Sequence, residues 1–410
     1  MKRILIIVTF SLHNAYNCWF FLNFTNFKPA ESLYQVSEAD IGLITTAGWI
    51  GIIVGLPLLV TKWHRSMLLF SGFLNTAPSL LRSYVSHNLS EFHGVDIVIL
   101  TNFLAGVSFG VLGAWPAMLA SQWPQEWRAT ITAICSLSNY AGGTAAVLTM
   151  PLIADEADGL LRVFEYQSYI AIALMVSTLT WSWIPPYESS NSTDLSTSVS
   201  ALTLRLSCNG LIIGITLLLQ GMNQYVFSSF GFSDFASGAA NSVYQGTAAV
   251  SGVALSLRVV DVDGVFFTRR KMVTMGAFGY LFFCVFLLTT GGKGKAAECT
   301  LYFLNAILGS TLMGALPLLL LESINEVNYG NDECVGENVV CGVVYFEAIA
   351  VAAVLTFLTT DESGSTTILV VGGLLIAALT GTLILDRREM KKSRETEVSR
   401  DNKKLLLRSA

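Results

Sequence analysis

Charged residues are scarce in this sequence. Asp, Glu, Lys and Arg make up 13% of its 410 residues, about half the share that is usual in soluble domains. The shortage is also local, because the ranges 41–60, 95–120 and 366–385 carry almost no charge. This composition excludes an ordinary soluble protein. The net charge is −5 and no basic stripe alternates with aromatic residues, which argues against nucleic-acid binding.

Residues that hold metals, disulfides or catalytic groups are also few. Most of the seven cysteines fall inside apolar runs, where cysteine is usually a small buried hydrophobic residue, so no disulfide framework is expected. The four histidines lack the spacing of a metal site, and no glycine-rich phosphate loop precedes a lysine. We therefore expect no enzyme activity, no metal and no cofactor.

Long apolar runs are what the sequence does have. About 20 apolar residues cross the hydrocarbon core as a helix, and helices are required there because the backbone must bond to itself. The first run follows Lys2 and Arg3 and lacks a small-residue cleavage site, which favours a membrane helix over a signal peptide. Twelve membrane helices are predicted, over 3–25, 39–61, 66–86, 95–119, 129–153, 166–184, 206–228, 239–257, 272–290, 300–321, 339–358 and 366–386.

These helices divide into two sets of six. The stretch after Pro185-Pro186 is rich in Ser, Thr and Asp, as is typical of a linker. We predict an all-α polytopic membrane protein with an N-terminal half (1–184), a cytosolic linker (185–204), a C-terminal half (205–386) and a basic cytosolic tail (387–410). Two six-helix bundles joined in this way are the layout of the major facilitator fold.

The basic residues predict the orientation. If the N-terminus is cytosolic, nineteen of the 24 Lys and Arg residues lie inside. Such a bias is typical of cytosolic loops, and an even number of helices then places both termini in the cytosol. Five basic residues lie outside: Lys28, Arg82, Arg162, Lys293 and Lys295.

Polar residues within the predicted spans indicate a binding site. Each is costly in lipid unless it faces a cavity or a partner, so for any single one a hydrogen bond between helices is an equal alternative. As a set they favour a cavity between the halves that binds a small solute. The predicted substrate-binding residues are Asn17, Trp19, Asn139, Tyr140, Asn223, Gln224 and Gln245.

Glu347 is the most deeply placed carboxylate in these spans. It lies near the middle of the helix predicted over 339–358, among Val344, Phe346 and Ala348. Burial there disfavours the ionised form. We predict that Glu347 couples transport to protons; the alternative is a neutral side chain that bonds to a neighbouring helix.

Charged residues near the predicted cytosolic helix ends are candidates for gating contacts. Adjacent bases and acids there can form salt bridges that hold helix ends together, and plain positive-inside anchoring is the alternative for the bases. In helix 5, Gly142 and Gly143 predict close helix packing. The predicted gating residues are Lys62, Arg65, Glu126, Arg128, Arg258, Asp261, Glu322 and Glu326.

Short motifs in a constant order add a family resemblance. They are Asn102–Gly106, Pro116, Trp123, Arg128–Ile134, Tyr140–Gly143, Pro185-Pro186, Thr300–Tyr302, Leu308-Gly309, Pro317, the Glu322/Glu326/Tyr329 spacing and Cys341–Val344. On these residues the chain resembles solute carrier family 49 of the major facilitator superfamily, over nearly its whole length.

The resemblance implies transport of a small, often cationic or vitamin-like solute. One branch of the family is linked to choline, ethanolamine and haem, and another to pyridoxine moved with protons. The helix-1 Trp of choline-handling members corresponds to Trp19. Their helix-5 and helix-11 Gln residues fall at Tyr140 and near Ile349, which favours the pyridoxine-like branch.

The sequence thus predicts a secondary or facilitative transporter that works by alternating access, without ATP, as a monomer in a lipid bilayer, with protons as a possible coupling ion. A receptor or sensor that kept the fold but lost transport is the alternative from another class. The tail carries Leu405-Leu406 after Asp401, a pattern of endolysosomal sorting. Both the plasma membrane and an endolysosomal or vacuolar membrane therefore stay open as locations.

Overall fold

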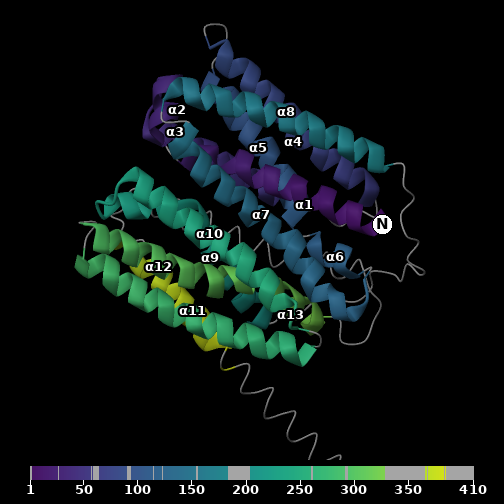
Figure 1. Cartoon of the computed structure of the whole chain (residues 1–410), viewed down its shortest axis with the longest axis vertical. Helices are drawn as coiled ribbons and strands as arrows, with labels where there is room; N and C mark the ends of the chain where they lie inside the picture. Colours follow the sequence, from purple (N-terminus) through teal and green to yellow (C-terminus); the bar gives the residue numbers. More distant parts are fainter. Residues whose placement is uncertain are drawn as a thin grey trace, which may run out of the picture.

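The chain folds into helices throughout the part described by the computed structural model. That part comprises residues 2–25, 27–56, 58, 64–89, 94–113, 115–121, 123–153, 156–182, 204–259, 262–290, 294–327, 365–366, 368–382 and 384. It contains no strand, which confirms the prediction of an all-α chain. The helices, drawn in Figure 1, are α1 (Lys2–Phe21), η1 (Leu22–Thr25), α2 (Phe27–Tyr34), α3 (Glu38–Gly55), α4 (His64–His87), α5 (Gly94–Gly113), α6 (Pro116–Ser121), α7 (Gln125–Ile153), α8 (Ala157–Ser182), α9 (Leu204–Ser229), α10 (Asp234–Ser256), α11 (Val262–Thr290), α12 (Lys295–Thr311), η3 (Met313–Ala315) and α13 (Leu316–Val327), followed by an apolar helix over Ile368–Thr382.

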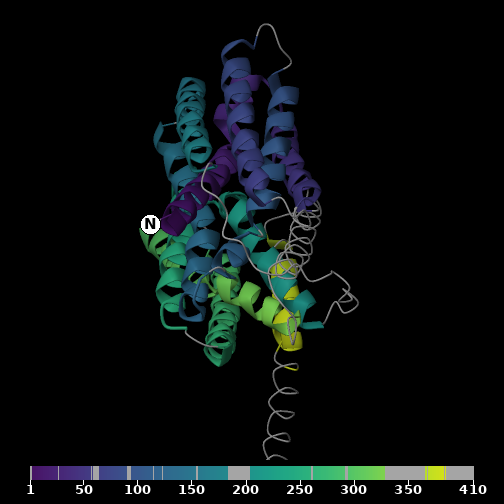
Figure 2. The same cartoon turned by 90° about the vertical axis from the view of Figure 1, so that its right-hand side faces the viewer.

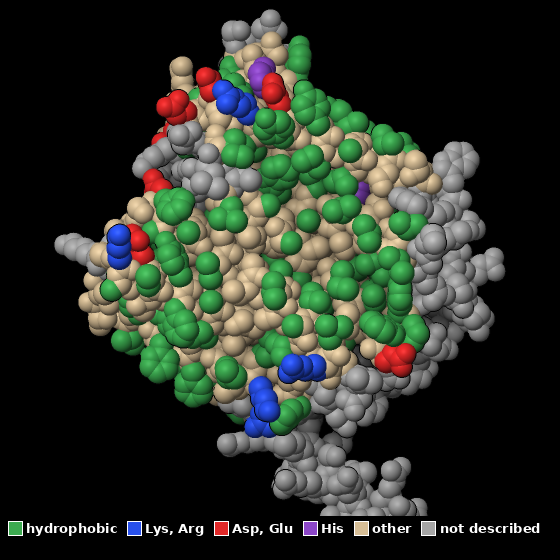
Figure 3. Space-filling view, in the orientation of Figure 1, with side chains coloured by type: hydrophobic (Ala, Val, Ile, Leu, Met, Phe, Trp, Pro, Cys, Tyr) green, Lys and Arg blue, Asp and Glu red, His purple; other side chains and the backbone are tan. Residues whose placement is uncertain are grey.

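Several helices have the length and composition of membrane spans. Within the described residues, six are long and apolar enough to cross a membrane: Ile4–Phe24, Gly94–Gly113, Glu126–Leu148, Ala157–Thr180, Phe267–Thr290 and Lys295–Leu321. In the face shown in Figure 3, charged side chains gather toward opposite edges and leave a broad hydrophobic and uncharged band between them. Large apolar side chains lie exposed along α11, among them Phe278, Phe282 and Val285. These features are compatible with a multi-pass membrane protein.

The described residues of the predicted ranges from 3–25 to 300–321 fall on helix except at range ends, and several helix boundaries differ from the prediction. The range 95–119 is divided at Trp115 between α5 and α6, and the range 300–321 is divided among α12, η3 and α13. The helix predicted from residue 166 begins at Ala157 instead. Its first turns were missed by the prediction because they carry the charged residues Asp158, Arg162 and Glu165. The range 339–358 lies outside the described residues.

The closest helix packing in the N-terminal part joins α3 to α5. A Cβ placed on Gly51 would lie 2.0 Å from the carbonyl oxygen of Phe103, and one on Gly106 would lie 2.1 Å from that of Gly48. Both distances are far below van der Waals contact, so only glycine fits where these backbones meet. The C-terminal part uses the same device, since a Cβ on Gly309 of α12 would lie 2.0 Å from the carbonyl oxygen of Tyr244 in α10.

The helices form two groups that meet along α7 and α10. In the N-terminal group (α1 to α8), α1 packs on α7 and α8, while α4 packs on α5 and α8. In the C-terminal group (α9 to α13), α12 packs on α10 and α11. Figures 1 and 2 both show the green helices of the C-terminal group beside the purple and blue helices of the N-terminal group. The extensive contact between α7 and α10 joins the groups. The linker range 185–204 lies outside the described residues except for residue 204, so the predicted domain boundaries stay predictions.

Arg82 of α4, one of the five basic residues predicted on the outer side, is completely buried. Its Nε donates to Thr101 Oγ1 at 3.2 Å, one terminal nitrogen donates to the Phe20 carbonyl at 3.1 Å, and the other donates to Asn102 Oδ1 at 3.0 Å. The guanidinium carbon lies 3.5 Å from the centroid of the Phe20 ring. Arg82 joins three helices, and it satisfies a carbonyl at the C-terminal end of α1.

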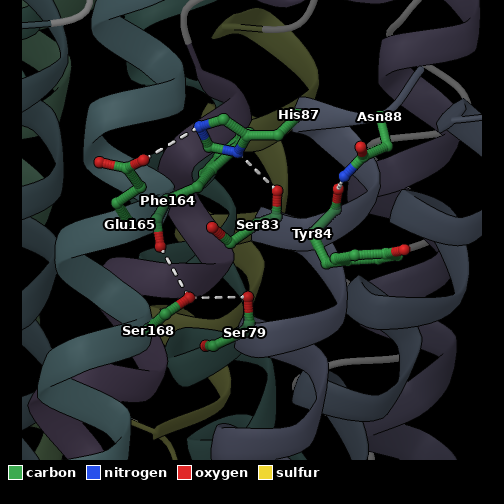
Figure 4. Close-up of polar contacts among 8 residues, drawn as sticks. All are labelled: Ser79, Ser83, Tyr84, His87, Asn88, Phe164, Glu165 and Ser168. Carbon is green, nitrogen blue, oxygen red and sulfur yellow. Dashed lines mark hydrogen bonds and ion pairs between the residues drawn. The ribbon is translucent and has the colours of Figure 1, made fainter. Parts of the chain in front are cut away.

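Near the C-terminal end of α4, exposed side chains connect α4 to α8 (Figure 4). The imidazole Nε2 of His87 lies 3.1 Å from Glu165 Oε1, and its Nδ1 lies 2.7 Å from the Ser83 carbonyl oxygen. One turn deeper, the Ser168 hydroxyl lies 3.0 Å from the Ser79 carbonyl oxygen. An exposed contact such as that between His87 and Glu165 contributes about 0.2–1 kcal/mol.

Candidate functional site

Four amide side chains gather where the two groups meet. Asn14 lies on α1, Asn139 on α7, Gln220 on α9 and Gln245 on α10, and each is at most 5% exposed. The helices that carry them are apolar over most of their length, so each amide must find a partner or a cavity. This cluster is the candidate site.

Gln220 occupies the middle of the cluster. Its Nε2 donates to Gln245 Oε1 at 3.0 Å and to the Sγ of Cys18 at 3.3 Å, so one amide joins α9 to α10 and to α1 of the other group. Asn241 holds the Gln220 backbone, because its Nδ2 donates to the Gln220 carbonyl at 3.0 Å. Gly143 of α7 leaves the space for the Gln245 amide: a Cβ there would lie 1.7 Å from Gln245 Oε1.

The two asparagines form the other side of the cluster. Asn14 Nδ2 donates to the Cys135 carbonyl at 2.9 Å and lies 3.3 Å from Ser138 Oγ. Asn139 Nδ2 lies 3.4 Å from both the carbonyl and the Oδ1 of Asn14. These last contacts are long for hydrogen bonds, whose usual length is about 2.9 Å. The Asn139 amide is thus weakly held and remains available to another partner.

Two small cavities adjoin the cluster. The first has a volume of about 20 Å³ and the second about 10 Å³, each with room for little more than a water molecule. Phe109, Asn139 and Leu217 line both of them. The first is lined by Cys18, Phe21, Leu22, Trp49, Ile52, Phe109, Asn139, Leu217, Gln220 and Gly221, and the second by Asn14, Phe109, Gly113, Ser136, Asn139, Tyr140 and Leu217. These walls combine aromatic faces with neutral polar side chains. Neither cavity has room for an organic solute unless the two helix groups separate.

The structure brings together only some of the predicted substrate-binding residues. Asn139 and Tyr140 line a cavity, and Gln245 bonds to a cavity residue. Asn223 is buried on α9 and lines neither cavity, while the side chain of Gln224 lies outside the described residues.

Asn17 and Trp19 do not lie where the sequence placed them. Asn17 Nδ2 donates to Asn75 Oδ1 at 2.7 Å and to the Ala105 carbonyl at 3.0 Å, inside the N-terminal group. Trp19 is half-buried and lies edge-on to Tyr16, with ring centroids 6.4 Å apart. The reason is the rotation of α1, on which Asn14, Cys18 and Phe21 face the cavities whereas positions 17 and 19 fall on either side of that face.

Gln220 was not among the predicted site residues. It follows the apolar run Leu217–Leu219, and the sequence analysis chose Asn223 and Gln224 one turn later on the same helix. No local signal distinguishes it from Asn223, which lies three residues later on the same helix face, so only the packing of α9 shows which amide lines the cavity.

The predicted gating residues are described only in part. Glu126 and Arg128 are exposed in the first turn of α7, and Arg128 Nε donates to the Trp123 carbonyl at 3.2 Å. Arg258 is exposed just after α10. For the other predicted gating residues, either the position or its side chain lies outside the described residues; they are Lys62, Arg65, Asp261, Glu322 and Glu326. Glu347 and Leu405-Leu406 also lie outside the described residues. Their roles stay predictions. No protein-family model matches this chain.

Proposed function

We propose that this protein is a secondary or facilitative transporter with a major facilitator fold, which carries a small polar or cationic organic solute by alternating access. One observation carries the proposal: a buried, neutral amide cluster with small cavities lies where α1 and α7 of one group meet α9 and α10 of the other. Buried polar groups at such a junction are costly unless they serve a partner, and a junction between two repeats is where transporters of this kind bind their solutes.

The packing pairs support two related halves. In the twelve-helix scheme α3 and α5 are the second and fourth helices of the first half, and α10 and α12 hold the same places in the second. Both pairs pack closely through glycine. The third and fourth helices also pack on each other in each half, as α4 on α5 and α11 on α12. Repeated pairs of this kind favour two six-helix bundles over a single irregular assembly.

Uptake into proteoliposomes tests the function directly. Purified protein should carry a member of the panel pyridoxine, choline, ethanolamine and haem, without ATP, and the resemblance to solute carrier family 49 favours pyridoxine. Liposomes without protein are the control. A protein that binds one of these solutes but moves none of them would instead be a membrane receptor or sensor.

A topology prediction tests the twelve-helix scheme. We expect both termini and the linker in the cytosol, with Asn88 on the outer or lumenal side. Asn88 directly follows the last turn of α4, where its Nδ2 donates to the Tyr84 carbonyl at 2.7 Å (Figure 4). Glycosylation mapping should therefore leave the Asn191-Ser192-Thr193 sequon unmodified. Modification at Asn191 would contradict the scheme, because an odd number of spans would then separate the linker from the N-terminus.

A proton-coupling prediction concerns Glu347. If this carboxylate is neutral in apolar surroundings and ionises when the cavity admits water, each cycle carries a proton. Glu347→Gln keeps the shape and removes the titration, so it should abolish the pH dependence of uptake and leave solute exchange at equal pH largely intact. Glu165→Gln, at an exposed carboxylate of α8 outside the predicted site, is the matched control. A pH profile unchanged in Glu347→Gln would leave the residue a structural role only.

A further inference from the structure

The amide of Gln245 is half-satisfied in the closed structure. Its side chain is completely buried and its Oε1 accepts from Gln220, but its Nε2 has no hydrogen-bond partner within the described part of the chain. A buried polar group without a partner costs about 1–3 kcal/mol. Other buried polar atoms of the described residues also lack a partner, among them Asn17 Oδ1 and Asn241 Oδ1. Gln245 Nε2 differs from them because it belongs to the side-chain amide pair that joins α9 to α10 beside the larger cavity.

The described residues around Gln245 do not supply the missing partner, but they leave space for the amide. Gly143 of α7 makes the space that the side chain fills, since any Cβ there would collide with Gln245 Oε1. The bonded neighbour, Gln220, lines the larger cavity. The Gln245 side chain is thus bonded directly to a residue of the cavity wall. It also lies on the contact between α7 and α10, which must open to admit a solute.

Two orientations of this amide pair lead to the same chemistry. As described, the unsatisfied atom of Gln245 is a donor. If both amides turn by half a rotation, Gln245 donates to Gln220 and its unsatisfied atom becomes an acceptor. A hydroxyl group donates and accepts, so it can complete the pair in either orientation.

We propose that Gln220 and Gln245 form the hydroxyl-recognition site of the solute cavity, and that in the closed state the two amides bond to each other in place of the solute. The inference rests on the proposed transport function and adds the solute feature that the site recognises. When the groups part, the link from Gln220 to Cys18 breaks, and a solute hydroxyl takes the place that opens beside the two amides.

The test compares binding of solutes that differ only by a hydroxyl. The probes are pyridoxine against deoxypyridoxine, and choline against ethyltrimethylammonium, measured by titration calorimetry on the full chain in nanodiscs. We compare the two members of whichever pair the unaltered protein binds. The hydroxylated member should bind about tenfold more tightly than the other, and this ratio corresponds to one hydrogen bond of about 1.4 kcal/mol. In Gln245→Met this ratio should fall to near one.

Ser242→Ala is the matched control on α10. Ser242 is also buried there, but its hydroxyl donates to the Gly238 carbonyl of its own helix at 3.0 Å, so the tenfold ratio should persist. Gln220→Met provides a second variant if Gln245→Met does not fold. Equal binding of both members of a pair by the unaltered protein would overturn the inference and leave transport intact. If no probe binds and none is transported, the proposed function fails for these solutes, and the inference fails with it.

Discussion

Replacing Arg82 by methionine should lower the free energy of unfolding by about 3–6 kcal/mol. The change keeps an apolar chain of similar length but removes the donors that satisfy Thr101, Asn102 and the Phe20 carbonyl. Each buried acceptor left without a partner costs about 1–3 kcal/mol. The contact between the Arg82 guanidinium and the Phe20 ring is also lost. Thermal unfolding in detergent, followed by the loss of the monodisperse peak, measures the effect.

Two further variants separate burial from charge. Arg82→Lys keeps the charge but offers a compact ammonium in place of the planar guanidinium, so it should recover only part of the stability. Glu165→Gln removes the exposed contact with His87 between α4 and α8, and should change stability by less than about 1 kcal/mol. If Arg82→Met were no more destabilising than Glu165→Gln, then the three buried bonds would contribute nothing to the fold.

Gly51→Ala should also destabilise the protein strongly, although it adds a single methyl group. The new Cβ would lie 2.0 Å from the Phe103 carbonyl oxygen, which is backbone and cannot rotate away. The helices must separate, and Gly106 would then lose its close approach to Gly48 as well. Overpacking typically costs about 1–3 kcal/mol, and we expect the upper end here because two helix backbones must move. The melting temperature and the yield of folded protein report it.

Gly373→Ala is the matched control. Gly373 is exposed in the helix Ile368–Thr382, and an added Cβ would meet no atom of the described residues within 4 Å. Alanine there should leave stability unchanged or raise it by about 0.5–1 kcal/mol through its better helix propensity. Equal melting temperatures for Gly51→Ala and Gly373→Ala would show that α3 and α5 do not rely on their glycine contact.

Apolar runs predicted the helices well because a run of that length has one way to satisfy its backbone in lipid. They predicted less well where polar residues enter a helix. The first turns of α8 carry Asp158 and Arg162, yet they bury Leu160 and Phe164 against other helices. The short helix α2 was missed for a different reason: its eight residues are too few to form a membrane span.

The binding cluster was harder to predict than the helices. A polar residue in an apolar run must face away from lipid, but it can face a cavity or another helix, and the run itself looks the same in both cases. Asn17 bonds to Asn75 within one group, whereas Asn139 faces the cavities between the groups. Choosing between them requires the rotation of each helix about its axis.

By itself, the sequence determined that this chain is helical, that much of it is apolar enough to lie in a membrane, and that polar side chains are placed inside these helices. These properties follow from local composition and from the need to satisfy every backbone group. Tertiary structure alone decided that Arg82 is buried, that Gln220 joins Gln245 to Cys18, and that Trp19 lies off the cavity. Such contacts join residues up to 202 positions apart, and they depend on how helices pack through glycine rather than on any local pattern.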